Sequence, residues 1–172
     1  MPPNVSPGSK DEVERRKGGE ISLGGLDDHI GYVLRRAQLA VFQDFIGSLA
    51  EFDIRPAQYS VLTVIEATPG LKQSQVSSAL GIQRTNFVTL FDELERRGLA
   101  RRMPVDNDRR SYALYLTETG AALMEKLRAA VHAHEARLDE RLGRDGRGRL
   151  MDLLKRLADL GGLDGEGRFG TP

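Results

Sequence analysis

The apolar positions in the first part of the chain recur every three to four residues, which is the repeat of an amphipathic helix. The first such segment covers about residues 27–50, and its repeating positions are Ile30, Leu34, Ala37, Val41 and Phe45. A second segment begins at Arg55-Pro56, because proline suits the first turn of a helix. It ends at Pro69-Gly70, a pair that favours a turn. The pattern therefore predicts two helices before residue 70.

Two shorter helical segments follow, with a tight turn between them. The first is QSQVSSAL at residues 73–80, and Gly81 provides its C-terminal stop. The second covers residues 83–97 and ends at Gly98; its apolar stripe consists of Phe87, Leu90, Phe91 and Leu94. Two amphipathic helices joined in this way are typical of a helix-turn-helix motif, although many helical proteins contain such corners.

After Gly98 the apolar pattern changes from a helical repeat to alternation, which predicts strands at residues 99–103 and 111–116. Between them lies a polar hairpin tip that carries two acidic residues and two arginines. A β-hairpin directly after the second helix has little purpose in a plain helical bundle. The order of elements therefore predicts a mainly α fold with a small β-hairpin wing, an α+β winged helix-turn-helix.

The C-terminal part of the chain returns to the helical repeat. Thr117 is a suitable N-cap for a fifth helix that continues to about Leu142, and residues 143–146 interrupt it. A sixth helix follows, with the apolar stripe Leu150, Leu153, Leu154, Leu157 and Leu160. The long terminal helices have more apolar positions than a small core needs to cover. We therefore expect a homodimer whose dimerisation helices, 26–51 and 117–160, flank a winged helix-turn-helix at 55–116.

The composition sets the boundaries of this domain. Residues 1–25 mix proline, glycine, serine and charge with few apolar residues, so we expect a flexible arm, and residues 161–172 predict a flexible tail. The domain between them covers residues 26–160. No run of about 18 apolar residues is present, which excludes a membrane span, and no secretory signal is evident, so the expected location is the cytoplasm.

The balance of 25 basic and 25 acidic residues gives no indication of a nucleic-acid partner, but their distribution does. Between residues 84 and 110 the chain has five acidic residues against seven arginines, which are Arg84, Arg96, Arg97, Arg101, Arg102, Arg109 and Arg110. Arginine suits bidentate and minor-groove contacts. The surplus is modest and is weak support for DNA binding by itself.

The sequence offers no catalytic constellation. Cysteine is absent, so thiol nucleophiles and thiolate metal sites are excluded. His132 and His134 are two residues apart on a helix and point in different directions, so they cannot share a metal ion. We therefore expect that the protein is not an enzyme, binds no metal and uses no cofactor, although it binds a small effector.

Several segments together resemble the MarR family of transcriptional regulators. They are GYVLRRAQ at 31–38, RPAQYSVLTVI at 55–65, DELERRGLARR at 92–102, DNDRRS at 106–111 and LTETG at 116–120. The resemblance covers residues 26–160, and the wing tip with LTETG is its most specific part. It implies a dimeric winged-helix protein, most often a repressor, which leaves its DNA operator when a small and often phenolic ligand binds.

The resemblance also implies which residues contact DNA. Asp108 and Arg110 match the wing motif of the family, in which the arginine enters the minor groove and the aspartate orients it. Arg109 at the same tip is a further candidate. The alternative is an ordinary solvated hairpin tip.

On the helix at 83–97, the positions that face DNA in the family are Arg84, Thr85, Asn86 and Thr89. Asn86 suits an adenine edge, and Arg84 suits a phosphate or a guanine. Ser74, near the start of the preceding helix, fits a phosphate contact. The chain departs from the family where Thr89 replaces a common arginine, so we expect a different operator. The alternative for each residue is an ordinary helix surface.

A ligand pocket is predicted on the first helix. His29, Tyr32 and Arg36 follow at spacings of three and four, which would place them on one face, with Arg35 beside them and Tyr59 completing the pocket. The segment IGYVLRRAQLAVF resembles the subgroup that controls hydroxycinnamate breakdown, whose inducers are aryl-CoA thioesters. Arginines would suit the CoA phosphates. The alternative is that His29 and Tyr32 only pack at the dimer interface.

Together these features predict a homodimeric repressor of aromatic-compound catabolic genes. It would bind a pseudo-palindromic operator in double-stranded DNA and be released by an aromatic acid or its CoA thioester. The alternative from another class is a winged-helix module that binds a protein through its wing. A steep salt dependence of duplex binding would separate the two, because neutralised phosphates release counterions.

Overall fold

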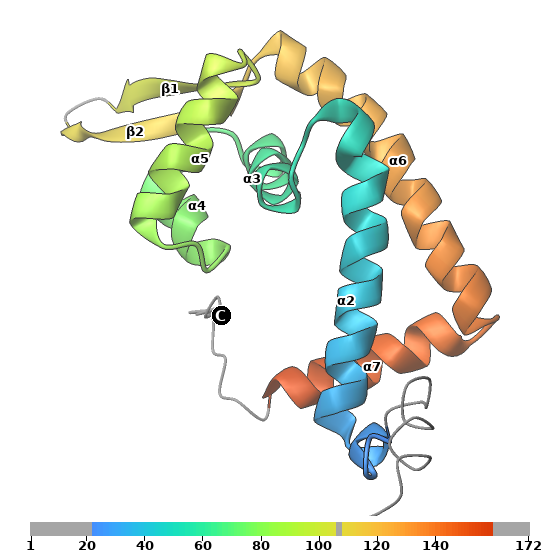
Figure 1. Ribbon diagram of the computed structural model, residues 1–172. Coiled ribbons are helices and arrows are strands. Elements are labelled where there is room, and N and C mark those ends of the chain that lie inside the picture. Colours follow the sequence, from blue (N-terminus) through green and yellow to red (C-terminus); the bar gives the residue numbers. More distant parts are fainter. Residues whose placement is uncertain (1–21, 106–107, 160–172) are drawn as a thin grey trace, which may run out of the picture. The chain divides into compact units, whose positions relative to one another are not determined.

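The computed structural model describes residues 22–105 and 108–159, and for residues 108–110 it describes only the backbone (Figure 1). The chain divides into two compact units, Met1–Leu39 and Ala40–Pro172. Most of the predicted arm at 1–25 and the predicted tail at 161–172 lie outside the described residues. In the described part, the elements are η1 (Leu26–Asp28), α2 (Ile30–Leu49), η2 (Ala50–Phe52), α3 (Pro56–Ala67), α4 (Gln73–Ala79), α5 (Arg84–Arg96), β1 (Ala100–Val105), β2 (Asp108–Leu116), α6 (Glu118–Leu142) and α7 (Gly146–Asp159).

This order confirms the predicted mainly helical fold with a β-hairpin wing, and the second unit holds the helix-turn-helix and the wing. Its core is built from the apolar stripes of the helices and from one face of the hairpin. The side chains that are fully buried there include Leu62, Ile65, Val76, Phe87, Phe91, Leu94, Leu114 and Met124. The rings of Phe87 and Phe91 stack with their centroids 6.0 Å apart, which fixes α5 on the core.

The hairpin is longer than the sequence predicted. β1 and β2 pair antiparallel from Ala100 opposite Leu116 to Pro104 opposite Tyr112, and the register then shifts so that Val105 pairs with Asp108. The predicted strands at 99–103 and 111–116 left out Pro104 and Val105 of the first strand and the polar residues 108–110 of the second, which were taken as the tip. Strand pairing uses backbone groups, so a run of polar residues can extend it without leaving a hydrophobic pattern in the sequence.

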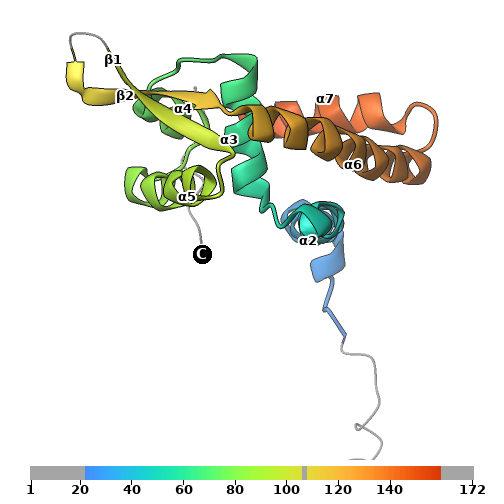
Figure 2. The same cartoon turned by 90° about the horizontal axis from the view of Figure 1, so that it is seen from above.

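β2 is also held on its second edge. The backbone N–H of Leu114 donates to the carbonyl oxygen of Leu71 at 3.0 Å, and the N–H of Gly70 donates to the carbonyl oxygen of Leu114 at 3.0 Å. The linker between α3 and α4 therefore pairs with the base of the wing. Figure 2 shows the hairpin projecting past α4 and α5 from this base.

α6 begins as predicted. The hydroxyl oxygen of Thr117 accepts from the backbone N–H of Gly120 at 3.0 Å, which caps the helix. α7 begins at Gly146, and its exposed large apolar residues are Leu150, Met151, Leu153 and Leu157. Leu160 of the predicted stripe lies outside the described residues. No helix within the described ranges is long and apolar enough to cross a membrane.

Candidate nucleic-acid interface

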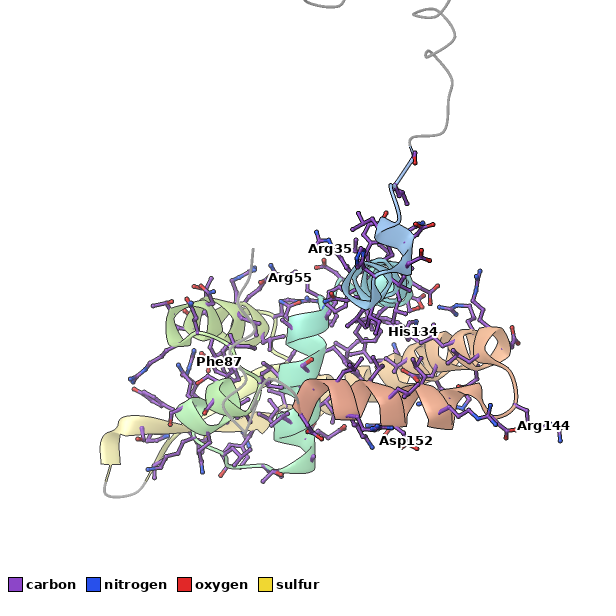
Figure 3. The ribbon with its side chains drawn as sticks, turned by 90° about the horizontal axis from the view of Figure 1, so that it is seen from below. Arg35, Arg55, Phe87, His134, Arg144 and Asp152 are labelled. Atoms are coloured by element: carbon purple, nitrogen blue, oxygen red, sulfur yellow. The ribbon has the colours of Figure 1, made fainter. Side chains whose placement is uncertain are left out.

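The first half of α5 presents its polar side chains to solvent. Arg84, Thr85, Asn86 and Thr89 are exposed, whereas Phe87 points into the core (Figure 3). This division follows from the helical repeat, because Phe87, Phe91 and Leu94 share one face of the helix. The four residues predicted from the sequence to contact DNA are therefore all available for contact, and that role stays a prediction.

One side of α5 borders a shallow hollow of about 240 Å³ that α4 and β2 also line. Ser74 from α4 and Arg84 and Val88 from α5 meet Ser111 and Tyr112 of β2 there. The structure thus brings together two of the predicted phosphate-contacting residues, Ser74 and Arg84. A hydroxyl beside a guanidinium gives a donor pair that suits a phosphate oxygen.

The other side of α5 borders a second hollow, of about 310 Å³, against the start of α3. Asn86 and Thr89 line it, together with Arg55 and Gln58. The hydroxyl of Thr89 donates weakly, at 3.4 Å, to the carbonyl oxygen of Thr85, so the Thr89 oxygen keeps lone pairs for an incoming donor. The predicted DNA contacts therefore form two groups, on opposite sides of α5.

Arg102 ties the wing to α5 and is largely enclosed. Its guanidinium lies 2.7 Å from a carboxylate oxygen of Asp92 and 2.6 Å from one of Glu95, and its side chain is 16% exposed. The backbone N–H of Arg102 donates to Glu95 as well, at 2.9 Å. The guanidinium also lies 4.6 Å from the ring centroid of Phe91. Arg102 was one of the seven arginines whose excess over acidic residues supported DNA binding, but its guanidinium contacts lie within the chain.

Arg97 was counted in the same surplus, and it too is engaged within the chain. Its guanidinium donates to the carbonyl oxygens of Phe52, at 3.1 Å, and of Asp53. One turn earlier, Glu93 pairs with Arg55 at the start of α3 (Figure 3). The C-terminal end of α5 is therefore fastened to residues 52–55 by two arginine contacts. Sequence reasoning missed both, because charge counting does not identify partners.

The predicted wing residues are only partly described. Asp108, Arg109 and Arg110 form the start of β2, and their side chains lie outside the described residues, as do residues 106–107 entirely. The backbone places the three residues at the far end of the hairpin from the core. Their assignment to DNA contacts stays a prediction from the sequence.

The predicted ligand residues are divided between the two units. In the first, the Arg36 guanidinium lies 6.0 Å from the ring centroid of Tyr32, as expected for positions four apart on a helix. His29 is not a helical residue, which corrects the expected shared face. Its backbone is extended, and its carbonyl oxygen accepts the first hydrogen bonds of α2 from Tyr32 and Val33. Arg35 lies on α2, exposed.

Tyr59 belongs to the second unit, where it is half-buried. Its ring meets the ring of Phe45 edge-on, with the centroids 5.7 Å apart. An apolar hollow that the sequence did not suggest lies in the same unit and has a volume of about 540 Å³. Its lining includes the apolar residues Phe42, Ile46, Ile54 and Pro56. It also includes two charged residues, Asp53 and Arg55. The exposed pair Phe42 and Ile46, four apart on α2, was the available indication in the sequence.

A buried histidine connects α2 and α6. His134 is 3% exposed, and its Nδ1 lies 2.5 Å from a carboxylate oxygen of Asp44 (Figure 3). The Arg137 guanidinium lies 2.7 Å from the same oxygen. Arg137, and after it His134, hold the pKa of the Asp44 carboxyl below its ordinary value by hydrogen bonding. The contact explains the histidine as part of the helix packing.

Comparison with known proteins relates this geometry to regulators. Residues 52–111 match the profile described as the MarR family. A protein of Thauera aromatica, described as a putative transcriptional regulatory protein for the hcr operon, is 34% identical over 139 residues. That alignment covers 80% of this chain and 84% of the relative.

Solved structures with the same fold include a regulator bound to DNA. The transcriptional repressor CouR bound to a 23-mer DNA duplex has a TM-score of 0.78 and 44% identity, over 81% of this chain and 99% of that one. CouR bound to p-coumaroyl-CoA has a TM-score of 0.74 and 41% identity, over 81% of this chain and 98% of that one.

Proposed function

We propose that this chain, which belongs to the MarR family of transcriptional regulators, is a homodimeric repressor of aromatic-compound catabolic genes. It binds a pseudo-palindromic operator in the cytoplasm through α5 and the wing, and an aromatic acid or its CoA thioester releases it. The observation that carries this proposal is the exposed polar start of α5, with a hollow on each side, in a chain 44% identical to a repressor solved on duplex DNA.

The arrangement suits major-groove binding. The exposed start of α5 offers a guanidinium, an amide and hydroxyl groups, which together cover donor and acceptor contacts to base edges and phosphates. The hollow that Ser74 and Arg84 line is open enough for a phosphate at the groove edge. Arg110 at the wing then reaches the adjacent minor groove, with Asp108 to orient it.

The effector is proposed from the relative and from residues of this chain. CouR has been solved with p-coumaroyl-CoA. Tyr32 and Arg36, in contact on α2, offer an aromatic ring and a cation to an aromatic acyl group and to CoA phosphates. Arg35, exposed on the same helix, is a further member of the proposed ligand set. The chain acts by binding alone, without catalysis.

DNA binding is tested by anisotropy with a labelled operator, selected from random duplexes, at salt concentrations from 50 to 200 mM. A logarithmic plot of the binding constant against salt should fall steeply, because each neutralised phosphate releases counterions. Arg110→Ala should weaken binding by about 1–3 kcal/mol, the size of a good groove contact, and Asp108→Ala by part of that. If the protein binds no duplex above background but binds another protein through its wing, the alternative of a winged-helix protein-interaction module is established.

Release is tested by titrating p-coumaroyl-CoA, feruloyl-CoA and the two free acids against the bound operator. The active effector should lower operator affinity by roughly five- to a hundred-fold, the usual range of coupling between two sites. Arg36→Ala should reduce the response to the effector without changing DNA binding in the absence of effector. Arg141→Ala on α6 should change neither the response nor the DNA binding. If only the free acids release the operator, the proposed pocket is supported, and the proposed contact of Arg36 with CoA phosphates is wrong.

A further inference from the structure

Val88 differs in chemistry from the exposed residues around it. It lies in the first half of α5 and is 38% exposed. Between positions 84 and 90 of that helix, the other exposed side chains, Arg84, Thr85, Asn86 and Thr89, can all form hydrogen bonds. Val88 cannot. Single apolar residues are common on protein surfaces, so exposure alone assigns Val88 no role, and its position among the polar groups is what matters.

Val88 is not part of the hydrophobic core cluster. Phe87 and Phe91 are fully buried on the inward face of α5, and Val88 lies outside that packed layer. Val88 instead lines the hollow that Ser74, Arg84 and Tyr112 also line. Arg84 is one helical turn before it and therefore shares its face of the helix. Val88 thus lies beside two polar groups suited to DNA phosphates and bases.

The major groove offers one apolar feature on its base edges, the 5-methyl group of thymine. A valine in a helix is confined to essentially one side-chain rotamer, so its two methyl groups occupy a fixed place and can select a fixed base position. We propose that Val88 specifies a thymine in each half of the operator by packing against its 5-methyl group. This inference rests on the proposed DNA-binding function and adds a base preference to it.

The test replaces each thymine of the selected operator, one at a time, by deoxyuridine, which removes only the methyl group and keeps base pairing. Wild-type protein should lose about fourfold in affinity at one thymine per half-site, the effect of one buried methyl group, and little elsewhere. Val88→Ala should bind the unmodified operator about that much more weakly and lose its sensitivity at the same position.

Val88→Thr provides the matched control, because it keeps the shape and exchanges one methyl group for a hydroxyl. It should fold like the wild type, with an unchanged urea midpoint, and show an intermediate sensitivity to the missing methyl. The proposal is overturned if no thymine position affects wild-type binding, or if Val88→Ala remains as sensitive as the wild type. If wild-type protein binds no duplex at all, the proposed function and this inference both fail, and that result is distinguishable from the loss of the thymine preference alone.

Discussion

A methyl group added to Gly120 would lie 1.9 Å from the backbone carbonyl oxygen of Leu99, far inside contact distance. The close approach arises because Leu99 leads into β1 while Gly120 is in the first turn of α6. The N–H of Gly120 bonds to the hydroxyl of the Thr117 cap, and that hydroxyl donates in turn to the carbonyl of Gly98 at 2.5 Å. The glycine therefore permits the junction between wing and helix.

Gly120→Ala should lower the free energy of unfolding by about 3 kcal/mol, the upper range for overpacking, because the opposing atom is backbone and cannot turn aside. Urea unfolding followed by circular dichroism measures this. Gly47→Ala on α2 is the matched control, since an added methyl group there meets nothing within 4 Å. It should be neutral or stabilising by up to about 1 kcal/mol. Equal effects of the two substitutions would contradict this explanation.

The Asp44 carboxylate should make stability depend on acidity. Its pKa is held below the ordinary value, which is about 3.9, by Arg137 and then by His134. A lowered pKa means that the contribution is complete well above pH 4, declines as the pH falls toward the unfolded-state value, and is gone below the folded-state value. The wild type should therefore lose more stability than Asp44→Asn between pH 6 and pH 3.

Urea midpoints of the two proteins across this range provide the measurement. Glu140→Gln, at an exposed position on α6, is the control and should follow the wild-type curve. Parallel curves for the wild type and Asp44→Asn would show that the contact contributes nothing to the folded state.

At the scale of the elements, the side chain of Arg102 on β1 joins the wing to α5 through its ion pairs with Asp92 and Glu95. Arg102→Ala should leave the carboxylates of Asp92 and Glu95 close together without their cation, and cost about 1–3 kcal/mol of stability. It should also loosen the angle of the hairpin against α5. Hydroxyl-radical footprinting of the operator should then lose minor-groove protection more than methylation interference loses major-groove contacts. Arg102→Lys should restore part of the stability.

The same measurements on Arg101→Ala separate this role from direct DNA binding, since Arg101 is exposed on the same strand. If Arg101→Ala and Arg102→Ala alter the two grooves alike, Arg102 contacts DNA and does not position the wing.

The elements also show what a sequence can predict. Helical periodicity located α3, α5 and α6, because the buried face of each has to recur every three to four residues. The hairpin was predicted to exist but too short, since backbone pairing at its polar end leaves no hydrophobic pattern. His29 was misplaced because spacing alone does not show where a helix begins. The partners of Arg97 and Arg102 are distant in sequence and could only be found in three dimensions.

At the scale of the whole molecule, α7 leaves large apolar residues in contact with water. Leu153 is 54% exposed and Met151 is 45% exposed, with Leu150 and Leu157 near 40%. A run of exposed apolar side chains along one helix indicates a surface that binds another chain. We propose a second copy, whose α5 would lie about 34 Å away and match half-sites one turn of DNA apart.

Leu153→Glu should therefore convert the dimer into a monomer at micromolar concentration, as measured by light scattering, and weaken operator binding at least tenfold. Lys155→Glu is the control, because two residues along the helix it faces the other way. A wild-type protein that is a stable monomer would contradict the dimer, and with it the expectation of a two-fold symmetric operator.

The two arginine contacts at the C-terminal end of α5 have a mechanical consequence. The helix has 13 residues and is therefore about 20 Å long. Its C-terminal end is fixed to residues 52–55 through Glu93 and Arg97, while Arg84 and Asn86 are at the other end. A tilt of about 5° at the fixed end displaces the far end by about 2 Å, roughly half the 3.4 Å spacing of successive bases along a strand. Because Phe87 and Phe91 also hold the helix on the core, such a tilt has to carry the packed core with it, and a small movement at residues 52–55 that does so takes the tip out of step with the DNA.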